Sequence, residues 1–447
     1  MASAAEQLVQ NLNFGAFAKA KELQQRILFT LFALIVYRIG TYIPLPGIDP
    51  ETVAQIFGKF SGGIGGMINM FTGGAIQRMA IFALNIMPYI SASIIMQLMT
   101  TVSPKLEAIK KEGEAGRKQI NQYTRYLTVV LAGFQAFAIA IGLQNATPSP
   151  VMNPGPLFLV STTVTLTGGT IFLMWLGEQI TARGIGNGIS LIIFAGIIAG
   201  LPGTLLKALE LGRTTDAGFT VLILFLVGIA VITIVVFFER AQRRLLVQYP
   251  KRQVGNRMFG GETSHLPLKV NSSGVIPPIF ASSLLLMPLT AATFTQGTGE
   301  GPFARVLSTI TAYMQHGSPL FMLSYAALII FFAFFYTAIV FNPQDTAENL
   351  KKYGGFIAGI RPGKRTADYI DYVLTRLTVV GSLYLTFVCL VPEFLNAQYA
   401  GLPYIGGTSL MIAVTVTMDT LAQLQGHLLA HQYEGLIKKA KLRGSRK

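Results

Sequence analysis

Cysteine, histidine and charged side chains are all scarce in this chain of 447 residues. The single cysteine, Cys389, cannot form an internal disulfide and has no neighbouring cysteine with which to bind a metal. Only 12% of the residues are charged and 51% are hydrophobic, whereas about a quarter of the residues in an ordinary soluble domain are charged. The composition therefore excludes a disulfide-stapled domain and favours a protein that is embedded in a membrane.

The sequence also lacks the motifs of the common enzyme classes. It contains no phosphate-binding Gly-x-x-x-x-Gly-Lys-Ser/Thr, no His-Glu-x-x-His and no recognisable Ser, His and Asp set. His427 and His431 have no carboxylate or cysteine ligand nearby, so we interpret them as part of a solvated tail helix. The glycine-rich residues 184–188 open a predicted membrane span, which argues against a nucleotide cradle. We therefore expect no enzymatic activity, no metal and no cofactor.

Long stretches without charged residues or histidine predict an all-α membrane protein with ten transmembrane helices. A helix needs roughly 20 mostly apolar residues to cross about 30 Å of hydrocarbon. The stretch at 126–177 is long enough for two spans and is divided by the turn-rich residues 144–150. The ninth span is short and ends at Pro392. The predicted spans are 27–46, 79–104, 126–143, 157–177, 184–206, 217–238, 270–294, 317–341, 377–392 and 405–425.

The distribution of lysine and arginine predicts that both ends of the chain lie in the cytoplasm. Ten spans place both ends on one side, and 29 of the 35 Lys and Arg residues fall on that side. Positive residues collect in cytoplasmic loops, so this bias supports the predicted topology. The net charge of +15 comes from short runs between apolar stretches, which is not the pattern of a nucleic-acid-binding face. The first residues lack a short apolar core beside basic residues, so we expect no removable signal peptide.

Two pairs of segments repeat within the chain. Residues 86–93 align with 275–282, and 188–193 align with 407–412, both five predicted spans apart. Each match is weak by itself, but both have the same spacing. Because five is an odd number of spans, the second copy of each segment would run in the opposite direction through the membrane. Together the matches predict two inverted halves around a central pore lined by spans 2, 5, 7 and 10. The expected division is a cytoplasmic segment at 1–26, an N-terminal half at 27–206, a C-terminal half at 207–425 with long cytoplasmic loops at 239–269 and 343–376, and a basic cytoplasmic tail at 426–447.

A glycine-rich segment precedes the second span. Glycines at 62–66 and 73–74 flank the short apolar stretch 67–71, which is too short to cross a membrane and too apolar to lie free in water. We expect a buried helix between flexible hinges. A packing element and a movable stopper both fit this pattern.

The pattern of spans also fits a secondary transporter with an inverted repeat of five plus five helices. Such a transporter needs polar or charged groups near the membrane midplane, because a buried charge is kept only where it serves a pathway. Arg38 and Asp419 are the ionisable residues that we place within spans, and both lie towards span ends. An intramembrane enzyme would need a buried nucleophile or metal set, which the sequence does not offer. A passage without a buried charge relay therefore fits better.

Five strings are distinctive beyond their hydrophobicity: Asn69–Ala75, Met87–Gln97, Gly184–Ser190, His265–Asn271 and Gly359–Gly363. They resemble the SecY family, the large subunits of the bacterial protein-conducting channel. The resemblance extends from about residue 20 to residue 440, includes loops, and is much more specific than shared hydrophobicity. It departs from the family where Asn85 replaces a common glycine and where Pro278 doubles a proline.

The resemblance implies an hourglass pore with a ring of aliphatic side chains at its waist, a plug at about 64–74, and a lateral gate between spans 2 and 7. Without the repeat and the resemblance, isoleucines in apolar helices would simply indicate core packing. The implied pore ring is Ile86, Ile90, Ile189, Ile193, Ile279 and Ile412. The implied plug residues are Met67, Ile68, Asn69, Met70, Phe71, Gly73 and Gly74, and the implied gate residues are Ser91, Gln97, Ser282 and Met287.

The resemblance also implies partners and a location. It suggests that Arg243, Lys251, Arg252 and Arg361 dock a motor or ribosome, although most basic loop residues are explained by topology alone. The implied partners are the small membrane subunits SecE and SecG, the motor ATPase SecA, the ribosome, secretory and nascent membrane polypeptides, YidC, SecD/SecF and the lipid bilayer. The implied location is the bacterial inner membrane.

Overall fold

The computed structural model describes most of the chain. The described residues are 21–59, 69–146, 149–214, 218–249, 252–254, 257–259, 263–295, 318–398 and 406–444. The chain divides into two compact units, and each is described by itself. Unit 1 comprises residues 1–208, 286–312 and 412–447, and unit 2 comprises residues 209–285 and 313–411.

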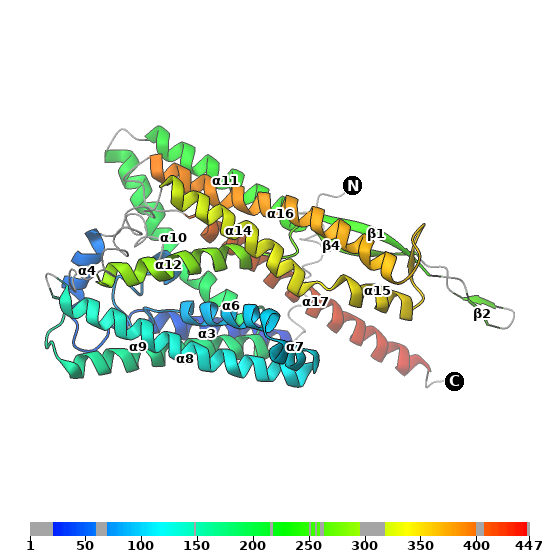
Figure 1. The fold of residues 1–447 in the computed structure, drawn as a ribbon, viewed down its shortest axis with the longest axis horizontal. Helices are drawn as coiled ribbons and strands as arrows, with labels where there is room; N and C mark the ends of the chain where they lie inside the picture. The colour runs from blue at the N-terminus through cyan, green and yellow to red at the C-terminus, as the bar shows by residue number, and fades with distance from the viewer. Residues whose placement is uncertain are drawn as a thin grey trace. The chain divides into compact units, whose positions relative to one another are not determined.

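Unit 1 is helical (Figure 1). Its core is a layer in which α8 packs along α9 and α6 packs against α8. Thr128, Ala132, Ala136 and Ala140 of α8 recur every four residues and are buried, so small side chains on one helical face permit this close packing. The helices are α3 (Lys21–Gly40), α4 (Pro50–Lys59), α6 (Met87–Val102), α7 (Pro104–Lys111), α8 (Glu114–Asn145), α9 (Pro156–Arg183) and most of α10 (Gly188–Thr214), together with α17 from Ile412 onwards.

Unit 2 combines apolar helices with a small sheet. Ser318 caps the start of α14 by accepting a hydrogen bond from the backbone N–H of Phe321 at 3.2 Å, and α14 packs along α16. α16 continues through Pro392, although the corresponding span was predicted to end there. The helices are α11 (Gly218–Arg240), α12 (Ile276–Thr295) as far as Leu285, α14 (Pro319–Val340), α15 (Pro343–Lys352), α16 (Lys364–Gln398) and the start of α17 (Gly407–Gly444).

The two long basic loops of unit 2 form a folded piece, which the sequence did not predict. β1 (Gln242–Gln248) pairs antiparallel with β4 (Thr263–Lys269), and also with β5 (Phe356–Ile357) from the other loop. The order in the sheet is β4-β1-β5, and β2 (Arg252–Val254) and β3 (Arg257–Phe259) form a separate hairpin. Leu245, Leu268 and Ile357 of the sheet share a core with α16 residues. The sheet therefore joins loops that lie about a hundred residues apart in the chain.

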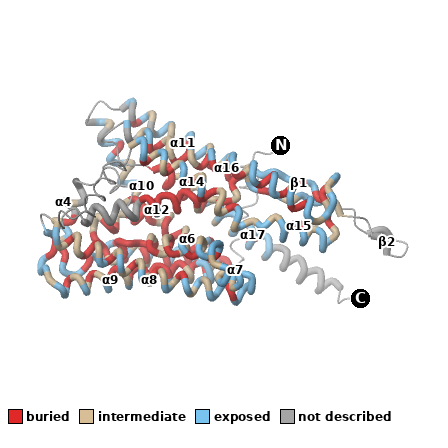
Figure 2. The backbone as a smooth tube through the Cα atoms, viewed as in Figure 1, coloured by how far each residue is buried: buried red, intermediate tan, exposed pale blue. Residues whose placement is uncertain are grey.

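Seven described helices are long and apolar enough to span a membrane: α3, α8, α9, α10, α11, α14 and α16. α6 and α12 are shorter apolar helices, and α17 occupies the position of the tenth predicted span. Large apolar side chains such as Leu28 (69%) and Phe219 (74%) are exposed, and Figure 2 shows exposed and buried positions alternating along α8 and α9. Exposed apolar surface of this kind fits contact with lipid. The chain is thus a mainly helical membrane protein, and the total of ten spans stays a prediction.

The segment before α6 is the main departure from the predicted spans. We expected a helix from residue 79, but residues 72–86 form successive turns and the helix starts at Met87. Pro88 lies in the first turn of α6, where its missing N–H is tolerated. Met79 and Asn85 have positive φ angles of 44° and 49°, which are incompatible with a right-handed helix.

The repeated segments occupy equivalent positions in their helices. Each copy of the proline-containing repeat lies at the start of a helix, at Met87 in α6 and at Ile276 in α12. Each copy of the glycine-containing repeat also lies at the start of a helix, at Gly188 in α10 and at Gly407 in α17. A Cβ on Gly188 would overlap the carbonyl oxygen of Gly177 in α9, and one on Gly407 would overlap that of Val388 in α16. Each glycine therefore lets its helix start directly against the backbone of the preceding span. The shared packing supports the internal repeat.

Candidate functional site

The six predicted ring isoleucines lie near the starts of the repeated helices. Ile86 precedes α6 and Ile90 lies in the first turn of that helix. Ile189 and Ile193 lie in the first two turns of α10, and Ile412 lies on α17. These five residues belong to unit 1, whereas Ile279 lies on α12 in unit 2. Five of the six are at most 8% exposed, and Ile189 is half-buried. Because the ring would include residues of both units, its closure around one axis stays a prediction.

The described part of the predicted plug is packed into unit 1. Met67 and Ile68 lie outside the described residues, whereas Asn69, Met70 and Phe71 are helical and are followed by turns at Gly73 and Gly74. Met70 and Phe71 are 6% and 4% exposed. The Phe71 carbonyl lies against α10, because a Cβ on Gly196 would be only 2.8 Å from that oxygen. This end of the predicted plug is therefore packed closely against α10, and we call this packing site its seat.

Two arginines hold the C-terminal end of the plug. Arg38 Nη1 and Arg78 Nη2 donate to the carbonyl oxygen of Gly73 at 2.8 and 3.2 Å. Both guanidinium groups also lie over the ring of Tyr42, at 4.7 and 4.1 Å from its centroid, and Arg38 donates to the Tyr42 hydroxyl at 2.8 Å. Carbonyls at a helix C-terminus lack intrahelical donors and carry partial negative charge, so cationic donors stabilise them.

The paired arginines bring like charges together. Neither Arg38 nor Arg78 forms an ion pair within the part of the chain that the structure describes. Partial burial is the main reason that the pKa of Arg78 lies below its ordinary value, and the Arg38 charge lowers it further. The Gly73 carbonyl oxygen and the aromatic face of Tyr42 help to offset this repulsion. The oxygens of Thr41 help as well, because Arg78 Nε donates to its carbonyl oxygen at 3.2 Å and Arg38 Nη1 to its hydroxyl oxygen at 3.4 Å.

Two further amides bind within the same turn region. Asn85 Nδ2 donates to the carbonyl oxygen of Phe71 at 2.8 Å, and Asn69 Nδ2 donates to Gln77 Oε1 at 3.1 Å. Asn85 is 3% exposed. The turns at 72–86 thus supply donors from Arg78 and Asn85 and an acceptor from Gln77 to the end of the predicted plug.

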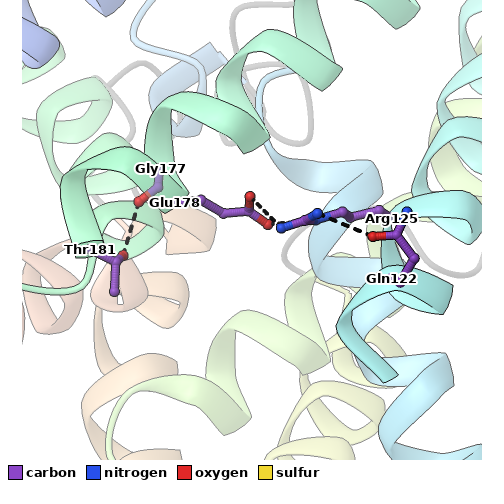
Figure 3. Close-up of polar contacts among 5 residues, drawn as sticks. All are labelled: Gln122, Arg125, Gly177, Glu178 and Thr181. Carbon is purple, nitrogen blue, oxygen red and sulfur yellow. Dashed lines mark hydrogen bonds and ion pairs between the residues drawn. The ribbon is translucent and has the colours of Figure 1, made fainter. Parts of the chain in front are cut away.

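A bidentate ion pair joins the neighbouring helices α8 and α9 (Figure 3). Arg125 Nε and Nη2 donate to the two carboxylate oxygens of Glu178 at 2.9 and 2.7 Å, while Arg125 Nη1 donates to Gln122 at 3.2 Å. The pair is partly exposed, with side-chain exposures of 42% and 31%. Bidentate geometry makes it one of the stronger kinds of exposed pair, and it fixes the register of the two helices at this end.

Three of the four predicted docking residues lie on the described loops of unit 2. Arg243 is exposed on β1, opposite Leu268 of β4. Arg361 is exposed between β5 and α16, and its carbonyl oxygen accepts a hydrogen bond from Thr366 Oγ1 at 3.0 Å. The backbone of Arg252 belongs to β2, and Lys251 lies outside the described residues. Arg361 is therefore exposed on a loop that is fixed by this hydrogen bond and by the packing of the neighbouring Ile360 against the core of the sheet and α16.

Comparison with known proteins identifies the family. The family model described as SecY matches residues 80–421. Curated proteins named protein translocase subunit SecY are 56% identical in Escherichia coli K12, over 95% of this chain and 96% of that protein, and 53% identical in Rickettsia typhi, over 95% and 98%. The chain belongs to the SecY family.

Solved structures share the fold of this SecY family member. A structure described as a protein-conducting channel has a TM-score of 0.63 at 19% identity and covers 90% of this chain and 92% of its own. Sec61 in a canine ribosome–channel complex has a TM-score of 0.61, also at 19% identity, with the same coverages. At these identities the likeness shows the fold.

The gate residues expected for a SecY protein are distributed over both units. Ser91 and Gln97 are half-buried on α6, and Gln97 Nε2 donates to Ser93 Oγ at 3.4 Å. Ser282 is 1% exposed on α12 and donates to the Ile279 carbonyl oxygen at 2.9 Å. The position of Met287 along α12 is described, but its side chain lies outside the described set. The gate stays a prediction.

Sequence reasoning missed the arrangement that holds the plug end. Arg38 was interpreted only as an ionisable residue near a span end, and Arg78 was assigned no role in a site. Their common acceptor, the Gly73 carbonyl, lies 35 residues from Arg38 along the chain, so no local pattern reveals the contact. Glu393 was also missed: it was placed beyond the ninth span, yet it is 2% exposed within α16.

Proposed function

We propose that this chain is the central pore-forming subunit of a protein translocation channel, through which unfolded polypeptides cross the membrane. The observation that carries the proposal is the match to curated SecY translocase subunits over 95% of the chain at 53% and 56% identity. The chain itself catalyses no chemical step, and the secondary transporter that its repeat also fits has no comparable support.

The proposed waist is the ring of six isoleucines. A dry aliphatic constriction blocks ions because it denies them hydration and offers no replacing ligands. The same side chains form no hydrogen bonds, so they do not hold any particular peptide sequence. A ring of isoleucines therefore seals the channel without selecting its cargo, whereas a selective transporter would need convergent polar groups.

The proposed plug is the segment at about 64–74. Its described end is buried and is held through its carbonyl oxygens by Arg38, Arg78 and Asn85. These bonds are individually modest, so a segment held in this way can be displaced when a polypeptide enters. Glycines at 62–66 and 73–74 would serve as the hinges of that movement.

The proposed lateral gate releases hydrophobic segments into the bilayer between spans 2 and 7. Ser91, Gln97, Ser282 and Met287 are its candidate residues. A signal helix would leave the pore because each of its large apolar residues gains about 0.3–0.6 kcal/mol on insertion. The structural likeness to other channels supports the shared fold in which such a gate would operate.

The proposed partners follow from the family. SecE and SecG would accompany the chain in the bacterial inner membrane, with both chain termini in the cytoplasm. SecA or a ribosome would dock on the basic loops near Arg243, Lys251, Arg252 and Arg361 and supply the energy, because the sequence contains no nucleotide-binding motif. YidC and SecD/SecF are further proposed partners.

A conductance measurement tests the proposed ring. Replacing Ile90, Ile193 and Ile279 together with serine should make vesicles that contain the channel leak ions, because serine hydroxyls admit water to the constriction. The matched control replaces Ile39, which is 58% exposed on α3, with serine. An unchanged conductance in the triple variant, with protein translocation retained, would remove the ring assignment.

A further inference from the structure

We propose that Asn85 is a positioning residue that latches the plug in its closed seat, through the hydrogen bond from its side-chain amide to the Phe71 carbonyl oxygen. The inference rests on the proposed function of the plug and adds the residue that sets how readily the plug opens. Asn85 and Phe71 both belong to unit 1, so the contact lies within one compact body.

The backbone at Asn85 explains which residues this position accepts. Its φ angle of 49° is left-handed, a conformation that glycine adopts freely and that asparagine tolerates better than most other residues. Glycine would satisfy the same backbone without strain. Asparagine therefore keeps the turn and adds a donor that glycine lacks.

The Asn85 amide donates to a buried carbonyl oxygen, that of Phe71. Asn85 Nδ2 lies 2.8 Å from Phe71 O, and the two residues are 3% and 4% exposed. Phe71 is the last helical residue of the plug, so its carbonyl faces the end of the helix. Among the described residues, the Asn85 amide is the donor bound to this oxygen. A buried carbonyl without a donor is costly, so the bond favours the seated plug.

The surroundings fix the geometry of this bond. A Cβ on Gly196 of α10 would lie 2.8 Å from Phe71 O and 3.0 Å from the hydroxyl oxygen of Tyr37. Tyr37 is fully buried on α3. The carbonyl is therefore enclosed by α10 and α3 while Asn85 binds it. Arg38 and Arg78 bind the Gly73 carbonyl oxygen, so the latch and the arginines act on separate carbonyls near one helix end.

The latch should be measurable as a change in plug exposure. In a background of Cys389→Ala, a cysteine placed at Met70 would react with a maleimide only when the plug leaves its seat, because Met70 is 6% exposed. Asn85→Gly removes the donor and preserves the backbone. Loss of one buried hydrogen bond should raise the open fraction, and with it the labelling rate, about fivefold.

The experiment uses the full chain, purified with the membrane subunits that accompany it and placed in phospholipid vesicles. The matched control is Asn153→Gly, the same exchange in an exposed loop of unit 1, which should leave the rate unchanged. A second variant, Asn85→Asp, keeps the side-chain shape but turns the donor into an acceptor, and should raise labelling at least as much. Equal rates for Asn85→Gly and the unaltered chain, or an equal rise in the control, would overturn the latch.

Ion conductance and precursor transport are recorded on the same vesicles, which separates the latch from the plug's function. Faster labelling with higher conductance supports both the latch and the plug. Faster labelling with unchanged conductance supports the latch and contradicts the sealing role of the plug. Unchanged labelling with normal transport contradicts the latch and leaves the translocation function standing.

Discussion

Replacing Gly196 with alanine should prevent the plug from seating. Gly196 lies on α10, where an added Cβ would be 2.8 Å from Phe71 O, 3.0 Å from Tyr37 Oη and 3.4 Å from Gly73 N. Two of these three atoms are plug backbone, which cannot rotate away as a side chain can. The seated plug must therefore shift, whereas the displaced plug has no such clash.

The size of the effect follows from the cost of overpacking. An extra methyl group in a tightly packed site costs about 1–3 kcal/mol. The part of this cost that comes from the backbone of Phe71 and Gly73 applies only to the closed state, whereas the Tyr37 contact is present in both states. The ratio of open to closed channels should therefore rise at least about 5-fold and at most about 150-fold. Alanine also favours a helix over glycine by about 1 kcal/mol, but α10 is helical in both states and that gain cancels.

Ion flux through reconstituted vesicles provides the assay, and the same helix provides the control. Gly200 lies one turn further along α10, and a Cβ there would have no neighbour within 4 Å. Gly200→Ala thus makes the same chemical change without the clash. We expect a higher resting ion flux for Gly196→Ala and an unaltered flux for Gly200→Ala. Equal fluxes for the two variants would refute the proposed seat.

Three further predictions concern other parts of the molecule. Alanine substitutions at Arg125 and Glu178, singly and together, should show a coupling of about 1 kcal/mol in thermal unfolding, and a value near zero would mean that the partly exposed pair does not hold α8 to α9. Gly407→Ala should destabilise the protein by about 1–3 kcal/mol, because the methyl group meets the backbone of α16, whereas Gly426→Ala on the same helix meets open space. Arg361→Glu should stop protein export while circular dichroism stays unchanged, and normal export would exclude Arg361 from docking.

Sequence reasoning succeeded where one physical signal dominates. Long apolar runs predicted the helices because few other structures satisfy the backbone within lipid. The internal repeat nominated spans 2, 5, 7 and 10 as the lining of a pore, which stays a prediction. In the structure its matched segments lie at equivalent helix starts, since the matched prolines open α6 and α12 and the matched glycines open α10 and α17. Proline and glycine are informative at these places because each has a strong backbone requirement.

The same reasoning failed where hydropathy is ambiguous. Residues 79–86 are as apolar as a helix, but they form buried turns with positive φ angles at Met79 and Asn85. The β4-β1-β5 sheet was missed because its strands are short and polar on one side, and because β5 comes from a different loop. Proline 392 was taken as a helix end, yet α16 continues beyond it. In each case tertiary packing overrides the local pattern.

The candidate site was predictable only in part. The family resemblance supplied the ring and plug positions, but not the contacts that hold them. Arg38, Arg78 and Asn85 all bind backbone carbonyls of the plug, and a carbonyl carries no sequence signature. The departure at Asn85 was visible in the sequence, whereas its bond to Phe71 depends on how the turns at 72–86 fold back onto the plug.

The most direct test of the central claim is to ask which side chains touch a polypeptide in transit. A photoreactive residue placed at Ile90, Ile193 or Ile279 should crosslink to a secretory polypeptide stalled halfway through the membrane. The same residue at Ile39, which is 58% exposed on α3, should not. Crosslinks from the three ring positions alone are the predicted result. Crosslinks that are absent from them, or equally frequent at Ile39, would contradict an isoleucine-lined passage.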